Sequence, residues 1–191
     1  MKKIYIALLL LLGVSLAKAE DGHSLWLRMS KNTTPAAVKT VGVKKTVVVT
    51  TAENELKQYW KGGQVILSLV GKSNDDSFTI GNDNDIITVS SSTENGLLYG
   101  AYALLRMQQT GEQIKTLSDT PTSNLRILNH WDNPDGTMER GFSGKSIFWK
   151  EGGVADLQVV REYGRACASI GINATVLNNV NAKALMLSQQ K

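Results

Sequence analysis

The sequence predicts an α/β protein in two parts: a small, sandwich-like N-terminal α/β domain at residues 20–117, and the first βαβ unit of a larger parallel-sheet domain at residues 125–191. In the first part, short β-branched and apolar runs are mixed with two helical patterns, which favours a layered α/β domain. In the second, a strand, a helix and a strand follow one another, which is typical of parallel pairing. Hydrophobic residues make up 42% and charged residues 20%, as in an ordinary packed domain.

The N-terminus has the pattern of a secretory signal peptide over residues 1–19. Two lysines precede an apolar run, Ile4–Val14, and Ala17–Ala19 has the small-residue form that signal peptidase cuts. The run is shorter than the ~20 residues that a membrane-spanning helix needs. We therefore expect a mature chain that begins near Glu20 and is secreted or periplasmic, with no membrane attachment after cleavage.

Charge and cysteine content exclude several classes of function. Three of the 21 basic residues lie in the leader, which leaves 18 against 17 acidic residues, so the mature chain has no electrostatic reason to bind nucleic acid. The only cysteine, Cys167, permits no internal disulfide. Because it shares a helical spacing with Leu157 and Val160, we interpret it as a buried small hydrophobe rather than a reactive thiol. The oligomeric state is left open.

In the N-terminal part, β-branched and apolar runs predict strands, and apolar residues at helical spacing predict a helix closed by Gly62 and Gly63. The strands are expected at Ser24–Met29, Thr46–Thr50 and Val65–Val70, and the helix at Ala52–Lys61. A polar cluster between Phe78–Ile80 and Ile86–Ser90 predicts a hairpin. A longer helix is expected over Asn95–Thr110, with Gly111 as its stop.

A linker is expected at residues 118–124, because Ser, Thr, Asp and Pro are concentrated there. After it, the pattern predicts a strand at Leu125–Leu128, a polar loop at Asn129–Gly144, a helix at Asp156–Ile170 and a strand at Ile172–Leu177. One βαβ unit cannot bury both faces of its sheet. We therefore expect exposed apolar strand surface, with aggregation or disorder after about residue 124.

Motif searches give no cofactor or metal site. Gly141–Ser146 ends like a phosphate-binding loop, but Glu139 occupies the position that requires the first glycine. His23 and His130 lie far apart with no cysteine cluster, which argues against zinc. The Gly-x-Ser-x-Gly pattern of a nucleophilic serine is absent.

The polar loop after the strand at 125–128 is the best candidate for a binding site, because parallel α/β folds place their sites at the carboxyl ends of strands. It holds His130, Trp131, Asp132 and Asn133, followed by Arg140. The flat face of Trp131 suits a sugar ring, and Arg140 suits a carboxylate. The alternative is structural: Trp131 covers the core beneath the loop, and Arg140 pairs with an aspartate of the same loop. The residues alone leave both interpretations open.

At these residues the sequence resembles the glycoside hydrolase family 67 α-glucuronidases. The resemblance rests on four segments and covers nearly all of the expected mature chain. They are Asn95–Arg106, Leu128–Phe148, Tyr163–Asn173 and Asn178–Ala182.

The resemblance implies an inverting hydrolase that releases 4-O-methylglucuronic acid from its α-1,2 link to xylose in glucuronoxylan oligosaccharides. It also implies that residues 125–191 begin a (β/α)8 barrel, which needs about 250 residues and is therefore incomplete here. The acid and base of the family lie on later strands, so no catalytic residue is assigned in this chain. The implied substrate-binding residues are Trp131 and Val180, with Arg140 and Asn179 as weaker candidates.

The sequence departs from the family after Ala182, where Lys183–Lys191 does not match and the chain stops. We expect these 191 residues alone to be a fragment without hydrolase activity. Two alternatives are a non-catalytic carbohydrate-binding or interaction module, and the accessory domain of another hydrolase such as a hexosaminidase. The Asn129–Asn133 motif argues against the second.

Overall fold

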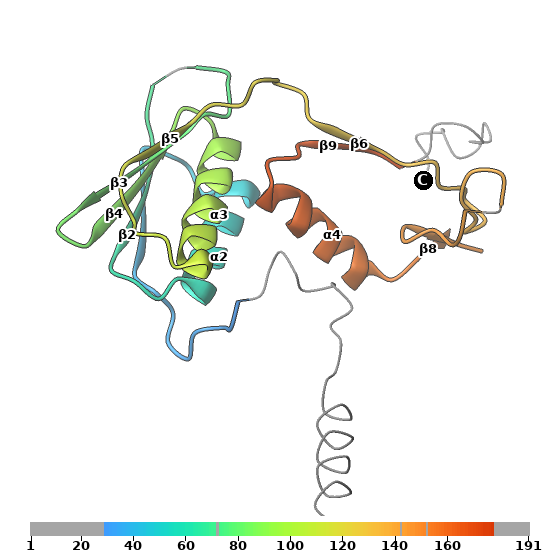
Figure 1. Ribbon diagram of the computed structural model, residues 1–191, viewed down its shortest axis with the longest axis horizontal. Coiled ribbons are helices and arrows are strands. Elements are labelled where there is room, and N and C mark those ends of the chain that lie inside the picture. Colours follow the sequence, from blue (N-terminus) through green and yellow to red (C-terminus); the bar gives the residue numbers. More distant parts are fainter. Residues whose placement is uncertain (1–28, 72, 142, 152, 178–191) are drawn as a thin grey trace, which may run out of the picture.

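The computed structural model describes residues 29–177 apart from residues 72, 142 and 152, and Figure 1 shows them in colour. The predicted leader and nearly all of the strand predicted at Ser24–Met29 lie outside the described residues. So do Asn179 and Val180. None of the described helices is long and apolar enough to cross a membrane.

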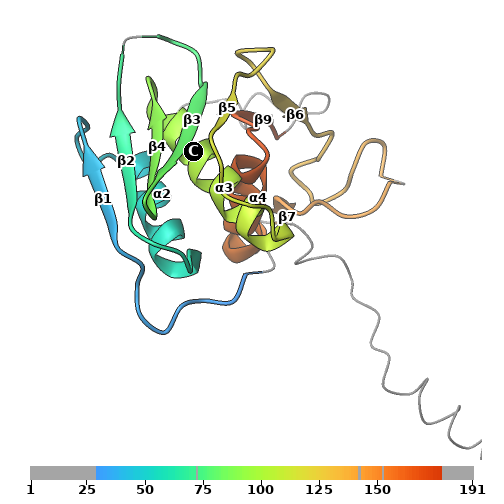
Figure 2. The same ribbon diagram turned by 60° about the vertical axis from the view of Figure 1, so that its left-hand side comes forward.

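The N-terminal part is a two-layer α/β structure with a mixed five-stranded sheet in the order β1-β2-β4-β3-β5, which is visible in Figure 2. Strands β1, β2 and β4 are parallel, and β3 runs antiparallel to both β4 and β5. Helices α2 (Val47–Tyr59) and α3 (Glu94–Thr110) cover one face (Figures 1 and 2). The strands are β1 (Val38–Val41), β2 (Val65–Leu69), β3 (Phe78–Asp83), β4 (Ile86–Ser91) and β5 (Leu117–Asp119).

The core lies between the sheet and the two helices. Gly100 on α3 allows close approach, since a Cβ built there would lie only 2.5 Å from Val89 Cγ1 on β4. Within this core, the side chains with less than 2% exposure come from α2, α3 and the three central strands. They include Val49, Leu56, Val65, Leu67, Ile80, Val89, Leu97, Leu104 and Leu105.

The prediction of a strand at Thr46–Thr50 was wrong, because this segment begins helix α2. The Thr46 side chain caps the helix by accepting a hydrogen bond from Val49 N–H. Val49 is fully buried and lies at helical spacing from Ala52 and Leu56, whereas Val47 is 84% exposed. The cap and the packing of one face outweigh the strand preference of the three valines. The helix predicted from Ala52 is confirmed as the continuation of α2, which ends at Tyr59.

The hairpin and the long helix are confirmed. Strands β3 and β4 are joined through Asn84 and Asp85, which both have positive φ, as a tight two-residue hairpin turn requires. Helix α3 is capped by Thr93 and ends at Gly111, whose φ of +70° is the left-handed conformation that glycine adopts without strain.

Two strands of the N-terminal part were not predicted. Val38–Val41 forms edge strand β1, which is too short to give a clear pattern in the sequence. Ser118 and Asp119, assigned to a linker by composition, instead complete β5 by pairing with Thr79 and Phe78 on β3. Backbone pairing with an exposed strand edge satisfies polar groups whatever the side chains are, so composition gave no signal here.

The second part contains the predicted βαβ unit: β6 (Ile127–Asn129), α4 (Leu157–Ser169) and β9 (Ala174–Val176). Strands β6 and β9 are parallel, with Leu128 opposite Thr175. Asp156 caps α4 at its start, and Gly171 follows its end with φ of +77°. The long β6–α4 connection also contains a small hairpin, β7 (Trp149–Lys150) and β8 (Gly153–Val154).

Helix α4 packs beside α3 and joins the two parts of the chain. Arg165 on α4 makes a bidentate ion pair with Glu55 on α2, at 2.8 and 2.7 Å, and its guanidinium lies over the ring of Tyr59. Arg126, just before β6, pairs with Asp76 at 2.9 Å. These contacts connect α4 and the start of β6 to the N-terminal part. The expectation of disorder after residue 124 stays a prediction. Ile127 on β6 is exposed. The expectation of aggregation therefore also stays a prediction.

Candidate functional site

The loop that follows β6 displays Trp131 between inward-facing polar neighbours. The Trp131 side chain is 45% exposed, whereas Asp132 is only 1% exposed and Asn133 is buried. The Trp131 carbonyl accepts a hydrogen bond of 2.8 Å from Glu139 N–H, which ties the start of the loop to its later part. Trp131 is therefore not buried beneath the loop, which is where the structural alternative placed it.

Asn133 cross-links this loop through hydrogen bonds of both its backbone and its side chain. Its backbone N–H donates to the Thr137 carbonyl, and its side-chain amide donates to both Thr137 Oγ1 and the Glu139 carbonyl, all at 2.8 Å. Glu139 has a φ of +50°, which is unusual for a non-glycine residue and is held by these bonds at both its N–H and carbonyl groups. The loop is thus ordered by its own polar groups rather than by an apolar core.

The three carboxylates of the loop bind groups of the protein itself. Asp135 accepts hydrogen bonds from the backbone N–H and the hydroxyl of Thr137, at 2.9 and 2.7 Å. Glu139 Oε2 accepts one of 2.6 Å from Ser143. Asp132 is too deeply buried to reach a ligand on the surface. That none of the three has a catalytic role stays a prediction.

His130 turns away from the surface toward α4. Its Nε2 lies 2.7 Å from the Tyr163 hydroxyl, which lies 2.9 Å from Thr175 Oγ1 on β9. Its Nδ1 lies 3.8 Å from Asp132 Oδ1. Burial raises the pKa of Tyr163, although the hydrogen bond to Thr175 opposes the shift, so the phenol keeps its proton at neutral pH. Sequence reasoning missed Tyr163 and Thr175, because no local pattern links positions 33 and 45 residues beyond His130.

Of the four predicted binding residues, the structure describes two. Trp131 and Arg140 are both exposed on the loop after β6. Asn179 and Val180 lie outside the described residues, so their placement beside Trp131 stays a prediction. The segment Gly141–Ser146, which resembled a phosphate-binding loop, leads into strand β7 and not into a helix, so it lacks the helix N-terminus that such a loop uses.

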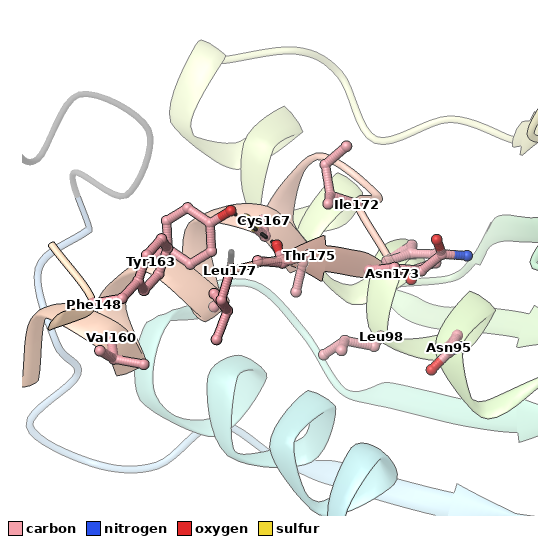
Figure 3. A pocket seen from close by; sticks show the side chains of 14 residues that line it. Asn95, Leu98, Phe148, Val160, Tyr163, Cys167, Ile172, Asn173, Thr175 and Leu177 are labelled. Carbon is pink, nitrogen blue, oxygen red and sulfur yellow. Dashed lines mark hydrogen bonds between the residues drawn. The ribbon is translucent and has the colours of Figure 1, made fainter. Parts of the chain in front are cut away.

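An apolar groove of about 430 Å³ lies between α3, α4 and β9, on the side of β9 that faces α4 (Figure 3). Its walls include Leu98, Tyr163, Cys167 and Leu177, and Trp131 is not among them. Cys167 is buried there, as its helical spacing predicted. Across the described part of the chain, no three His, Cys, Asp or Glu side chains gather as a metal site would require.

Sequence comparison with known proteins points to one family. Residues 105–191 match the family model described as "Glycosyl hydrolase family 67 middle domain". This match includes Lys183–Lys191, which corrects the expectation that the sequence departs from the family after Ala182. "Alpha-glucuronidase A" of Aspergillus tubingensis is 34% identical over 221 aligned residues, and "Probable alpha-glucuronidase A" of Aspergillus niger is 33% identical, each match covering 94% of this chain. These matches support a family 67 α-glucuronidase fragment. The chain spans about a quarter (26%) of the length of these two relatives.

Among solved structures, the family GH115 4-O-methyl-α-glucuronidase BtGH115A is similar, with a TM-score of 0.47 and 12% identity over 76% of this chain and 25% of that one. That score is too low to bear on the fold or the site of this chain. The Trp131 loop and the βαβ unit both lie within the segment that matches the family 67 middle domain.

Proposed function

We propose that this chain is the N-terminal portion of a secreted α-glucuronidase, and that it supplies part of the site for the glucuronic acid substituent of xylan oligosaccharides. The observation that carries the proposal is the similarity to α-glucuronidases over 94% of the chain. It is supported by the exposed Trp131, which lies at the carboxyl end of β6 on a loop held by its own hydrogen bonds. An indole face packs against the apolar face of a sugar ring, and the nearby Arg140 is suited to the uronate carboxylate.

In this proposal residues 20–117 form an accessory domain, and residues 125–191 begin a (β/α)8 barrel. Asn179 and Val180, which follow β9, line the same uronate pocket as Trp131. The reaction is inverting, with an acid and a base carried by residues that follow position 191, since the carboxylates near Trp131 are bound within their own loop. We expect residues 1–191 to bind the uronate and not to cleave the bond.

Binding is tested by calorimetric titration of the 191-residue polypeptide with an aldouronic oligosaccharide and with an unsubstituted xylo-oligosaccharide of equal length. We expect tighter binding of the aldouronic sugar. Trp131→Ala should weaken it at least tenfold, or about 1.4 kcal/mol, and Trp131→Phe should weaken it less. Ile147→Ala is the matched control, because Ile147 is a similarly exposed apolar residue in the same connection. Equal affinity of wild type and Trp131→Ala would refute the role of Trp131, and release of free uronic acid would refute the absence of catalysis.

A non-catalytic carbohydrate-binding module is the second candidate. It is favoured by the same observation, that the carboxylates near Trp131 are hydrogen-bonded within their own loop. It predicts comparable affinity for the substituted and unsubstituted oligosaccharides, because a module built on stacking alone does not need the uronate. A clear preference for the aldouronic sugar therefore separates the two proposals.

Export is a separate part of the proposal, supported by the pattern of residues 1–19. Expression of the full chain in a bacterial host and N-terminal sequencing of the exported product should give a first residue at or near Glu20. Recovery of the uncleaved chain from the cytoplasm alone would contradict export.

A further inference from the structure

The strand that leads to Trp131 separates its side chains onto two faces. Successive side chains of a strand point to opposite sides, and the pairing continues past β6, because His130 N–H donates to the Val176 carbonyl at 2.9 Å. Leu128 lies opposite Thr175, whose hydroxyl meets Tyr163 of α4. His130, two residues beyond Leu128, therefore lies on the α4 side, and Trp131 lies on the opposite side.

The His130 ring is held from several directions. The Tyr163 hydroxyl bonds to its Nε2 at 2.7 Å and to Thr175 Oγ1 at 2.9 Å, and Figure 3 shows the Tyr163 hydroxyl directed at Thr175. The ring also meets Phe148 edge-to-face, with centroids 4.9 Å apart, and Tyr163 at 5.4 Å. Phe148 is buried. Such contacts leave the imidazole one orientation, which strand β9, helix α4 and the β6–α4 connection define together.

The residue on the other side of Trp131 is also fixed. Asp132 is buried, and its Oδ1 lies 3.8 Å from His130 Nδ1. With the side chains of residues 130 and 132 both turned inward, the backbone at residue 131 has little freedom to rotate, and the indole is directed outward.

We propose that His130, held by Tyr163 and Thr175, is the positioning residue that fixes the orientation of Trp131 for sugar binding. The proposal rests on the proposed function for the identity of the ligand. In this proposal α4 orients the indole before the ligand binds and does not itself contact the ligand. Pre-organisation improves affinity because the ordering cost is met before the ligand arrives.

The test combines binding with a direct signal from Trp131. The 191-residue polypeptide is labelled with 5-fluorotryptophan, and the Trp131 ¹⁹F resonance is assigned by its loss in Trp131→Phe. Tyr163→Phe removes one hydroxyl and keeps the ring packing with Phe148. His130→Leu removes both ring nitrogens, and His130→Gln restores a polar group at the reach of Nε2. Val160→Ala is the control, because Val160 also lies on α4 and lines the same apolar groove as Tyr163.

We expect Tyr163→Phe and His130→Leu to move the Trp131 resonance toward that of free fluorotryptophan. Both should weaken aldouronic sugar binding about fivefold, the equivalent of one hydrogen bond of about 1 kcal/mol. His130→Gln should recover most of the affinity. Val160→Ala should lower the melting temperature and leave both the resonance and the affinity unchanged.

Two results would overturn the proposal: an unchanged Trp131 resonance in Tyr163→Phe, or a shift as large in Val160→Ala as in Tyr163→Phe. If the wild type binds no aldouronic sugar but Tyr163→Phe still moves the resonance, the proposed function fails and the positioning role stands.

Discussion

The ion pair between Glu55 and Arg165 gives a direct test of how the βαβ unit is attached to the N-terminal domain. The two residues lie 110 positions apart in the sequence and make two hydrogen bonds, at 2.8 and 2.7 Å. Their side chains are 11% and 23% exposed, so the pair is mostly removed from water. Burial lowers the pKa of Arg165, but Glu55 outweighs it and the net shift is upward, so the guanidinium stays charged.

The expected cost of breaking this pair lies between two known limits. An exposed pair contributes up to about 1 kcal/mol, whereas removing one partner of a fully buried pair costs about 3–5 kcal/mol. With the partial exposure seen here, we expect Glu55→Gln and Arg165→Met each to lower the free energy of unfolding by about 2–3 kcal/mol. The double variant should be less destabilised than the sum of the two, because it leaves no uncompensated charge.

The assay is urea denaturation followed by circular dichroism, together with limited proteolysis that maps where the chain becomes accessible. We expect both single variants to be cleaved between residues 120 and 177 before the N-terminal sheet is attacked. Arg161→Met is the matched control, because Arg161 is an exposed arginine on the same helix. The reasoning is refuted if Glu55→Gln changes stability by less than 0.5 kcal/mol, the usual range of a surface substitution, or if the two variants add without coupling.

Three further predictions concern the N-terminal domain. Thr46→Ala should cost about 1 kcal/mol in thermal unfolding, because it removes the N-cap of α2; an unchanged melting temperature would show that the cap is dispensable. Gly100→Ala should destabilise by about 1–2 kcal/mol, since a methyl group there meets Val89 and the clash exceeds the gain in helix propensity; a more stable variant would contradict the close packing. The hydrogen bond from Lys57 lowers the pKa of Glu53 despite burial. The stabilisation is therefore complete above the unfolded value of 4.5 and lost as the pH falls through the lowered folded value. Melting curves should show a smaller acid destabilisation for Glu53→Gln than for wild type, and equal slopes with pH would contradict this.

The sequence predicted elements that are determined locally and missed those that depend on distant partners. The β3–β4 hairpin and α3 follow from a polar turn and from apolar spacing ended by Gly111, and both were predicted. Thr46–Thr50 was misassigned because β-branched residues favour strands until a cap and a buried face decide otherwise. Strand β5 depends on an open edge of β3, which no residue of Leu117–Asp119 reveals.

The same distinction holds at the candidate site. The residues alone left open whether Trp131 is exposed for binding or covers the core, and only the resemblance to a known family favoured the binding role. What orients it was not visible in the sequence, because the His130–Tyr163–Thr175 contacts join a strand end, a helix and a second strand. Only the assembled βαβ unit brings these three groups together.

Under the proposed function, this arrangement would give the N-terminal domain a part in ligand binding without any contact to the ligand. Arg165 ties α4 to α2, and Tyr163, two residues earlier on α4, holds the His130 ring. Helix α4 is thus held at one side by the ion pair to α2 and at the other by the hydrogen bond to His130 at the end of β6. Through these two contacts, the position of the N-terminal domain affects the loop after β6. It follows that loosening Glu55–Arg165 should weaken sugar binding as well as stability. The loss of affinity should be smaller than in Tyr163→Phe, because the His130–Tyr163 bond remains when only the outer attachment is released.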